Sequence, residues 1–106
     1  MIEKFEVDNK IGVMVSGGFG AGWSTWNNEY EEFFLFDKGL IELIMSDAPF
    51  EDIETYVHSK TSDDVYLGGY DGLYVDMIEK GRKFVVDEYD GSEGLRFEDE
   101  MHWHQT

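Results

Sequence analysis

The chain contains no cysteine among its 106 residues. Disulfide bonds, thiolate metal sites and a cysteine nucleophile are therefore excluded. It also lacks any apolar run that approaches the roughly 18 residues of a membrane-spanning helix. Its first residues have neither the basic start nor the apolar core of a signal peptide. We therefore expect a soluble cytoplasmic protein with no membrane partner.

Basic residues are scarce as well. Eight Lys and Arg stand against 24 Asp and Glu, which gives a formal net charge of −16. Nucleic-acid affinity comes largely from Lys and Arg that displace counterions from phosphates, so direct binding of DNA or RNA is not expected. The charge is uneven, because residues 29–64 carry eleven acidic and only two basic residues. The acidic pole therefore lies in the middle of the chain.

Apolar residues, in contrast, are plentiful. Hydrophobic residues make up 42% of the chain and aromatic residues 16%, which is too much apolar material for a disordered acidic chain. A length of 106 residues suits a single hydrophobic core. The sequence therefore predicts one folded domain over residues 1–106.

Strands are predicted at both ends of the chain. Alternating stretches at residues 2–7 and 10–15, with turn-forming Asp8 and Asn9 between them, are typical of a β-hairpin. Further strands are predicted at residues 30–36, 65–67, 73–78, 82–89 and 95–97. The strand at 82–89 is apolar on both faces, which favours a central place in the sheet.

Two helices are predicted between these strands. Asp37 is a favourable N-cap for a helix that ends near Asp47, and a second helix follows Pro49 and ends near Lys60. The resulting fold class is α+β, with a mostly antiparallel β-sheet covered on one face by the two short helices of residues 37–60.

A glycine-rich loop spans residues 16–28. Its Gly18-Phe19-Gly20-Ala21-Gly22 segment resembles a dinucleotide-binding loop, but Trp23 stands where the pattern needs glycine and no amphipathic helix follows. No nucleotide or other cofactor is therefore expected. Trp23 and Trp26 either form a recognition surface or pack inward, and inward packing is the more common outcome for Trp.

Catalytic and metal-binding patterns are weak. His102 and His104 lie at strand spacing near acidic residues, but a zinc site needs three or four ligands and nothing else in the chain completes the set. His58 is expected on the polar side of a helix, without a nucleophile beside it. A catalytic carboxylate pair cannot be identified from sequence. We therefore expect no metal site and no enzyme activity.

The acidic residues allow two interpretations. Net charge by itself keeps a protein dispersed. Carboxylates about 6.7 Å apart on a strand, or about 6 Å apart on a helix, can instead imitate a row of phosphates. The residues predicted to contact a partner in this way are Glu29, Glu31, Glu32, Asp47, Glu51, Asp52, Glu54, Asp63 and Asp64. Trp23 and Trp26 of the glycine loop are predicted as further contact residues.

Several motifs carry a family resemblance. The segment from Ser16 to Trp26 resembles small, acidic, uncharacterised proteins of bacteriophages and prophages, and so do the segments at 37–40, 66–73 and 87–91. The resemblance spans most of the chain. It implies a phage context, in which small acidic proteins are often inhibitors of host defence, anti-CRISPR proteins and DNA mimics among them.

Three classes of function stay open at this point. The leading one is an inhibitor that binds a host protein at a basic, nucleic-acid-binding surface through residues 29–64. The second is a small structural or assembly protein that makes its contact through the glycine loop. The third is a small ligand-binding domain, or a small enzyme, that uses this loop as the rim of a pocket.

Overall fold

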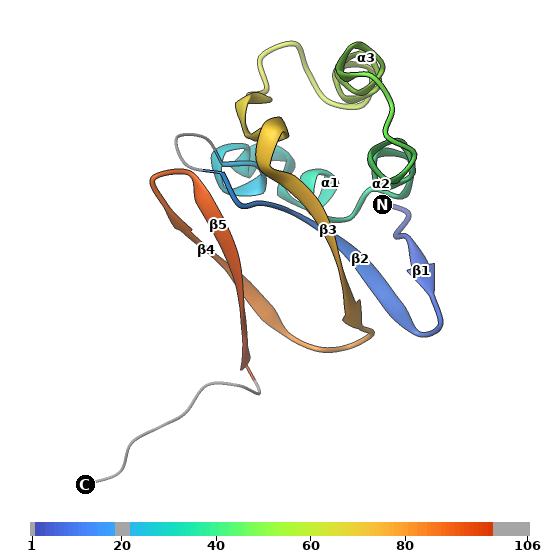
Figure 1. Ribbon diagram of the computed structural model, residues 1–106, viewed down its shortest axis with the longest axis vertical. Helices are drawn as coiled ribbons and strands as arrows, with labels where there is room; N and C mark the ends of the chain where they lie inside the picture. Colours follow the sequence, from blue (N-terminus) through green and yellow to red (C-terminus); the bar gives the residue numbers. More distant parts are fainter. Residues whose placement is uncertain (1, 19–21, 99–106) are drawn as a thin grey trace, which may run out of the picture.

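The strand β2 (Lys10–Ser16) is the element around which the protein is arranged. The computed structural model describes residues 2–18 and 22–98. In it, β2 pairs antiparallel with β1 (Glu6–Val7) on one side and with β3 (Leu73–Glu79) on the other (Figure 1). The predicted N-terminal hairpin is confirmed. Its two turn residues, Asp8 and Asn9, have positive φ angles of 52° and 64°, as a tight hairpin turn requires.

The side chains of β2 belong to two separate hydrophobic cores. Met14 lies in a core built mainly with the helices, whereas Val13 and Val15 lie in a second core with the C-terminal strands. Alternate residues of a strand point to opposite faces of the sheet, so one short strand serves both cores. β2 therefore has six consecutive buried residues, from Ile11 to Ser16.

The helices α2 (Lys38–Met45) and α3 (Phe50–Lys60) confirm the two predicted helices. Asp37 caps α2 as expected, because its Oδ2 accepts a hydrogen bond of 3.0 Å from the backbone N–H of Leu40. Within the described ranges, no helix has the length and apolar character needed to cross a bilayer.

A third helix replaces the strand predicted at residues 30–36. The chain forms a short 3₁₀ helix, η2 (Asn28–Tyr30), followed by α1 (Glu31–Phe36). Phe33 and Phe34 pack in the helical core and Leu35 packs in the second core. A strand between two cores would send neighbouring residues to different cores, whereas Phe33 and Phe34 are neighbours in the same core, as a helix allows. Aromatic content alone does not distinguish the two.

The C-terminal strands form their own sheet, which corrects two further predictions. β4 (Phe84–Tyr89) and β5 (Ser92–Phe97) pair only with each other in the described chain, through a turn at Asp90 and Gly91 with φ angles of 50° and 86°. The strand predicted to be central is thus an edge strand, with Val85 exposed. Residues 65–67 form no strand and lead instead into a 3₁₀ helix, η3 (Gly68–Gly72).

The fold is therefore α+β, with three α-helices and five antiparallel strands in two sheets over the described residues. The helices gather at one end of the molecule, and the β4–β5 hairpin lies at the side of the β1–β2–β3 sheet (Figure 1).

Candidate functional site

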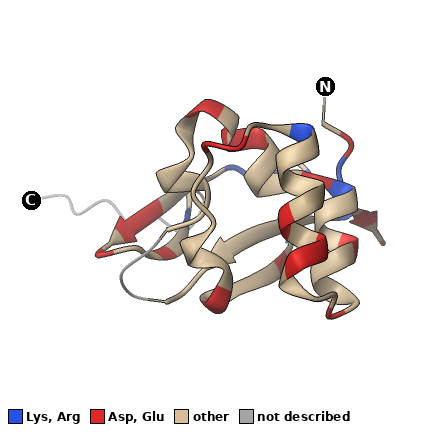
Figure 2. Cartoon of the chain, turned by 90° about the horizontal axis from the view of Figure 1, so that it is seen from above, with Lys and Arg blue, Asp and Glu red and all other residues tan. Residues whose placement is uncertain are grey.

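All nine acidic residues predicted to contact a partner are exposed. They come from η2, α1, the α2–α3 turn, α3 and the loop that follows α3. Figure 2 shows Asp and Glu as separate segments on the helices and their connecting loops, with few Lys and Arg among them. The acidic residues thus surround the helical end of the molecule and do not form one continuous row.

Few of these carboxylates are neutralised within the protein. Among the described ion pairs, only one involves the nine residues, with 3.8 Å between His58 Nδ1 and Asp63 Oδ1. The other described pairs are Lys80 with Glu6 and Arg96 with Asp87. The negative charge of the helical end is therefore left largely to solvent or to a partner.

Two of the acidic residues also support local structure. Glu51 and Asp52 occupy the first turn of α3, whose N-cap residue, Pro49, makes no side-chain capping bond. Negative charge at this end of a helix interacts favourably with the helix dipole. Part of the acidic character of α3 is therefore explained by helix stability alone.

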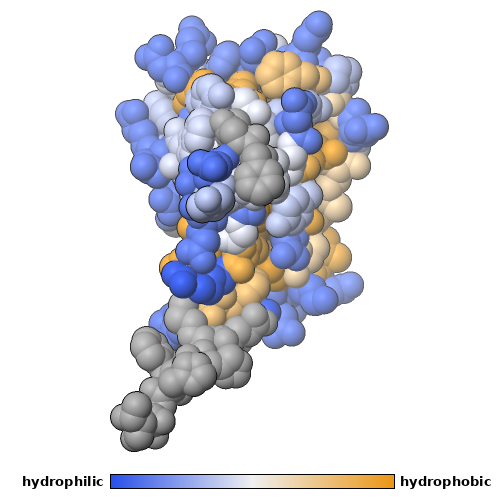
Figure 3. Space-filling view, turned by 60° about the vertical axis from the view of Figure 1, so that its left-hand side comes forward, coloured by the Kyte–Doolittle hydropathy of each residue, from blue (hydrophilic) through white to orange (hydrophobic). Residues whose placement is uncertain are grey.

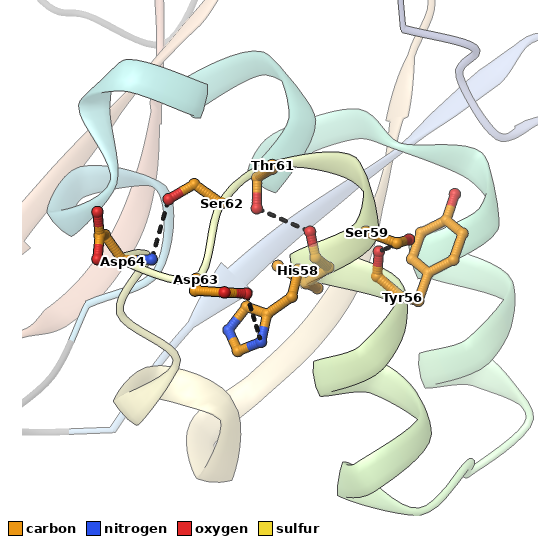
Figure 4. A network of polar contacts seen from close by, with 8 residues as sticks. Tyr56, His58, Ser59, Thr61, Ser62, Asp63 and Asp64 are labelled. Carbon is orange, nitrogen blue, oxygen red and sulfur yellow. Dashed lines mark hydrogen bonds and ion pairs between the residues drawn. The ribbon is translucent and has the colours of Figure 1, made fainter.

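The loop after α3, which carries Asp63 and Asp64, is stabilised by hydrogen bonds between residues close in sequence (Figure 4). Thr61 Oγ1 donates to the carbonyl of Val57 at 2.7 Å, and the N–H of Asp64 donates to Ser62 Oγ at 2.9 Å. Asp63 reaches back toward the half-buried His58. Asp63 and Asp64 therefore lie in a loop whose conformation is fixed by local hydrogen bonds.

Trp23 does not lie on the surface, which corrects its prediction as a contact residue. Its side chain is fully buried, and its Nε1 donates a hydrogen bond of 2.9 Å to the carbonyl of Phe34. Its ring meets the ring of Phe34 edge to face, with 4.8 Å between centroids. Trp23 therefore anchors the loop to α1 and cannot contact a partner from this position.

Trp26 does remain accessible. It is 41% exposed, lies against the exposed ring of Tyr66 with 5.3 Å between centroids, and donates from Nε1 to Glu88 Oε1. Of the two tryptophans, only Trp26 is a candidate contact residue.

Gly69 and Gly72 of η3, which face the glycine loop, have a structural explanation. A Cβ on Gly69 would lie closer than 3.0 Å to the backbone carbonyl of Gly22, and a Cβ on Gly72 would lie equally close to the backbone N of Gly18. The two glycine-rich segments, far apart in sequence, thus touch through their backbones. This close approach of the two backbones requires glycine at positions 69 and 72.

Glu93 is a key buried residue that the sequence analysis did not identify. It is the buried acidic residue of the described chain, and its two carboxylate oxygens accept four hydrogen bonds. The donors are the N–H groups of Ser16, Trp23 and Thr25 and the hydroxyl of Thr25, at 2.6–3.1 Å. With all four bonds directed inward, Glu93 holds the glycine loop to β5 and has a structural role. Nothing in its local sequence distinguishes it from the other acidic residues.

A second polar cluster fixes α2 against α3. The Tyr56 hydroxyl donates a hydrogen bond of 2.6 Å to Asp37 Oδ2, and a side chain at Gly39 would collide with that hydroxyl. Burial, and then the neighbouring carboxylate of Asp37, raise the pKa of Tyr56 well above its usual range. Burial also raises the pKa of Tyr74, with Asp76 and Glu93 nearby.

A groove of about 770 Å³ lies between α1 and β4 and is called here the α1–β4 groove. Its apolar lining comes from Leu35, Phe36, Phe84 and Val86, which also pack in or against the second core. Glu31 and Glu32 line the α1 side, and Arg82 and Lys83 line the side near the start of β4. Figure 3 shows small hydrophobic areas that reach the surface between hydrophilic ones.

The histidines of the C-terminal tail, His102 and His104, lie outside the described residues. Within residues 2–18 and 22–98, no group of three His, Asp or Glu side chains is arranged to hold a metal ion.

Comparison of the chain with protein-family models, with curated proteins and with solved structures found no match. The resemblance to phage proteins therefore stays a prediction.

Proposed function

We propose that the protein is a binding protein, of the phage inhibitor type, that occupies a basic, nucleic-acid-binding surface of a host protein. The observation that supports this proposal is the state of the acidic helical end. Nine carboxylates are exposed there, and one of them takes part in a described ion pair. Unpaired surface charge of one sign steers association with a surface of opposite charge.

The contact centres on α3 and its flanking turns. Glu51, Asp52 and Glu54 are exposed on this helix, and Asp47 and Asp63 lie before and after it. Basic residues that normally hold phosphates would meet these carboxylates in their place. The occupied surface is then closed to nucleic acid, which is the inhibitory effect.

The test begins with a pull-down from bacterial host lysate, followed by titration of the purified partner at two salt concentrations. Affinity should fall steeply with salt, because exposed charges are screened over about 8 Å at physiological ionic strength. Duplex DNA should compete for the partner. Binding that is insensitive to both salt and DNA would contradict the proposal.

Charge reversals locate the contact. Glu51→Lys, Asp52→Lys and Glu54→Lys should each weaken binding, with stability changes below about 1 kcal/mol because exposed charges contribute little to folding. Glu79→Lys is the matched control, since it changes net charge equally at an exposed position on β3. An equal loss of affinity in Glu79→Lys would mean that binding depends on the net charge alone and not on a contact at α3.

The assembly-protein alternative is favoured by a different observation, the exposed pair of Trp26 and Tyr66. Aromatic side chains of this kind often dominate interface energetics. Binding or self-association that is lost in Trp26→Ala, but kept in the α3 charge reversals, would select this alternative.

A further inference from the structure

Within the described residues, the outer edge of β4 pairs with no other strand. β4 pairs with β5 alone in the described chain, and the N–H of Glu98 donates to the carbonyl of Lys83 at 3.0 Å. Lys83 therefore faces β5, and bonding alternates along an antiparallel pair. It follows that the backbone groups of Phe84, Val86 and Glu88 point away from β5. No backbone bond from these three residues to another described strand is present.

The α1–β4 groove runs along this free edge. Phe36, Phe84 and Val86 line the groove, and the rings of Phe36 and Phe84 meet edge to face with 6.2 Å between centroids. Natural proteins usually protect such edges with proline, bulges or covering elements. β4 contains neither proline nor a bulge in its register with β5. An unpaired edge beside a partly apolar groove is the arrangement used by domains that add a peptide strand to their own sheet.

We propose that the α1–β4 groove binds an extended segment of a partner protein, which pairs with the free edge of β4 and carries Lys or Arg two residues away from an apolar side chain, so that both lie on the face that meets the groove. The apolar side chain would rest on Phe36 and Val86. The basic side chain would meet Glu31 and Glu32, which are exposed on the α1 side. Backbone bonds supply affinity, and alternate side chains supply specificity.

The net charge of the protein favours a basic peptide segment in the groove over a second copy of the chain. Edge-to-edge pairing of two copies would bring together two molecules of net charge −16. Like charges at this density oppose self-association, whereas a basic segment is attracted. The site shares Glu31 and Glu32 with the acidic helical end but lies on α1 and β4 and not on α3. Peptide binding that survives the α3 charge reversals separates it from the proposed function.

The probe is a fluorescent octapeptide in which lysine and valine alternate at the odd positions and serine fills the even positions, measured with the wild-type protein by anisotropy. Two further peptides carry N-methyl groups either on all the serines or on all the lysines and valines. In an added strand, only one of these two sets directs its N–H groups toward β4. One methylated peptide should therefore bind about tenfold or more weakly, and the other within about twofold of the parent. Equal effects of both methylations, or no binding of the parent, would overturn the proposal.

Substitutions in the protein provide the second arm. Val86→Pro removes an outward N–H without removing a β4–β5 bond, and should weaken peptide binding about tenfold. Tyr89→Phe, at an exposed position of β4 outside the lining of the groove, is the control and should bind as wild type. If Val86→Pro fails to fold, Glu31→Lys combined with Glu32→Lys should produce a similar loss. Dimerisation through β4 in sedimentation, without peptide binding, would identify a second copy as the occupant and refute the proposal.

Discussion

The carboxylate of Glu93 and the backbone N–H of Trp23 are joined by a hydrogen bond of 2.6 Å between residues 70 positions apart in the sequence. The same carboxylate also accepts from Ser16 and from Thr25. One side chain on β5 thus ties together the end of β2, the glycine loop and the 3₁₀ helix η1 (Ser24–Trp26).

Replacement of Glu93 should therefore destabilise the whole domain. Glu93→Ala leaves several buried N–H groups without an acceptor, and the free energy of unfolding should fall by about 3 kcal/mol or more. Glu93→Gln keeps one carbonyl acceptor and should lose less. Urea denaturation measures both. Glu79→Ala, at an exposed position on β3, is the control, and a Glu93→Ala protein as stable as this control would contradict the role assigned to Glu93.

The contact between the two glycine-rich segments gives a second prediction. Gly69→Ala and Gly72→Ala each force a Cβ into the backbone of the facing segment, so each should cost about 2 kcal/mol or more. Gly94→Ala is the matched control, because a Cβ there meets nothing within 4 Å. It should change stability by less than about 1 kcal/mol in either direction. Thermal unfolding of the three variants checks this, and three similar melting temperatures would exclude the close approach.

The elements that the sequence predicts well are those set by local signals. Asp37 caps its helix by a bond to Leu40, three residues away, and the Asp8-Asn9 turn forms by its own backbone preference. α1 is different, because Phe33, Phe34 and Leu35 are helical only as a result of packing between two cores. No local pattern in that run separates helix from strand.

The candidate site, like the fold, is predictable from the sequence only where local properties of the residues determine it. Exposure of the acidic residues follows from their charge, since Asp and Glu are rarely buried without partners. Glu93 is the exception, and its burial depends on donors that come from residues 68 to 77 positions away. The α1–β4 groove likewise depends on α1 being a helix and on β4 being an edge, and both of these features are tertiary.

The different burial of Ile53 and Ile44 predicts different losses of stability when each is replaced by Asp. Ile53 on α3 is 1% exposed, whereas Ile44 on α2 is half-buried. Ile53→Asp places an unpaired charge in the helical core and should unfold the domain or lower its stability by several kcal/mol. Ile44→Asp should lose clearly less, because solvent reaches the new carboxylate. Thr55→Asp, on the exposed side of α3, is the control. Circular dichroism with thermal melting ranks the three, and equal losses for Ile44→Asp and Ile53→Asp would contradict the assigned faces.

The bond between Tyr56 and Asp37 makes stability depend on alkaline pH. Burial and the Asp37 carboxylate raise the pKa of Tyr56 in the folded protein above the value near 10 of an unfolded chain. The folded state therefore retains a proton that the unfolded state loses, so this contribution is complete below about pH 10 and declines as pH rises further. Tyr56→Phe should be about 1–2 kcal/mol less stable at pH 8 and should decline less steeply above pH 10. Tyr89→Phe, at a strongly exposed position, is the control for loss of a hydroxyl and should be as stable as wild type at pH 8. Urea titrations of wild type and Tyr56→Phe between pH 8 and 11 test the prediction, and parallel profiles for these two proteins would refute it.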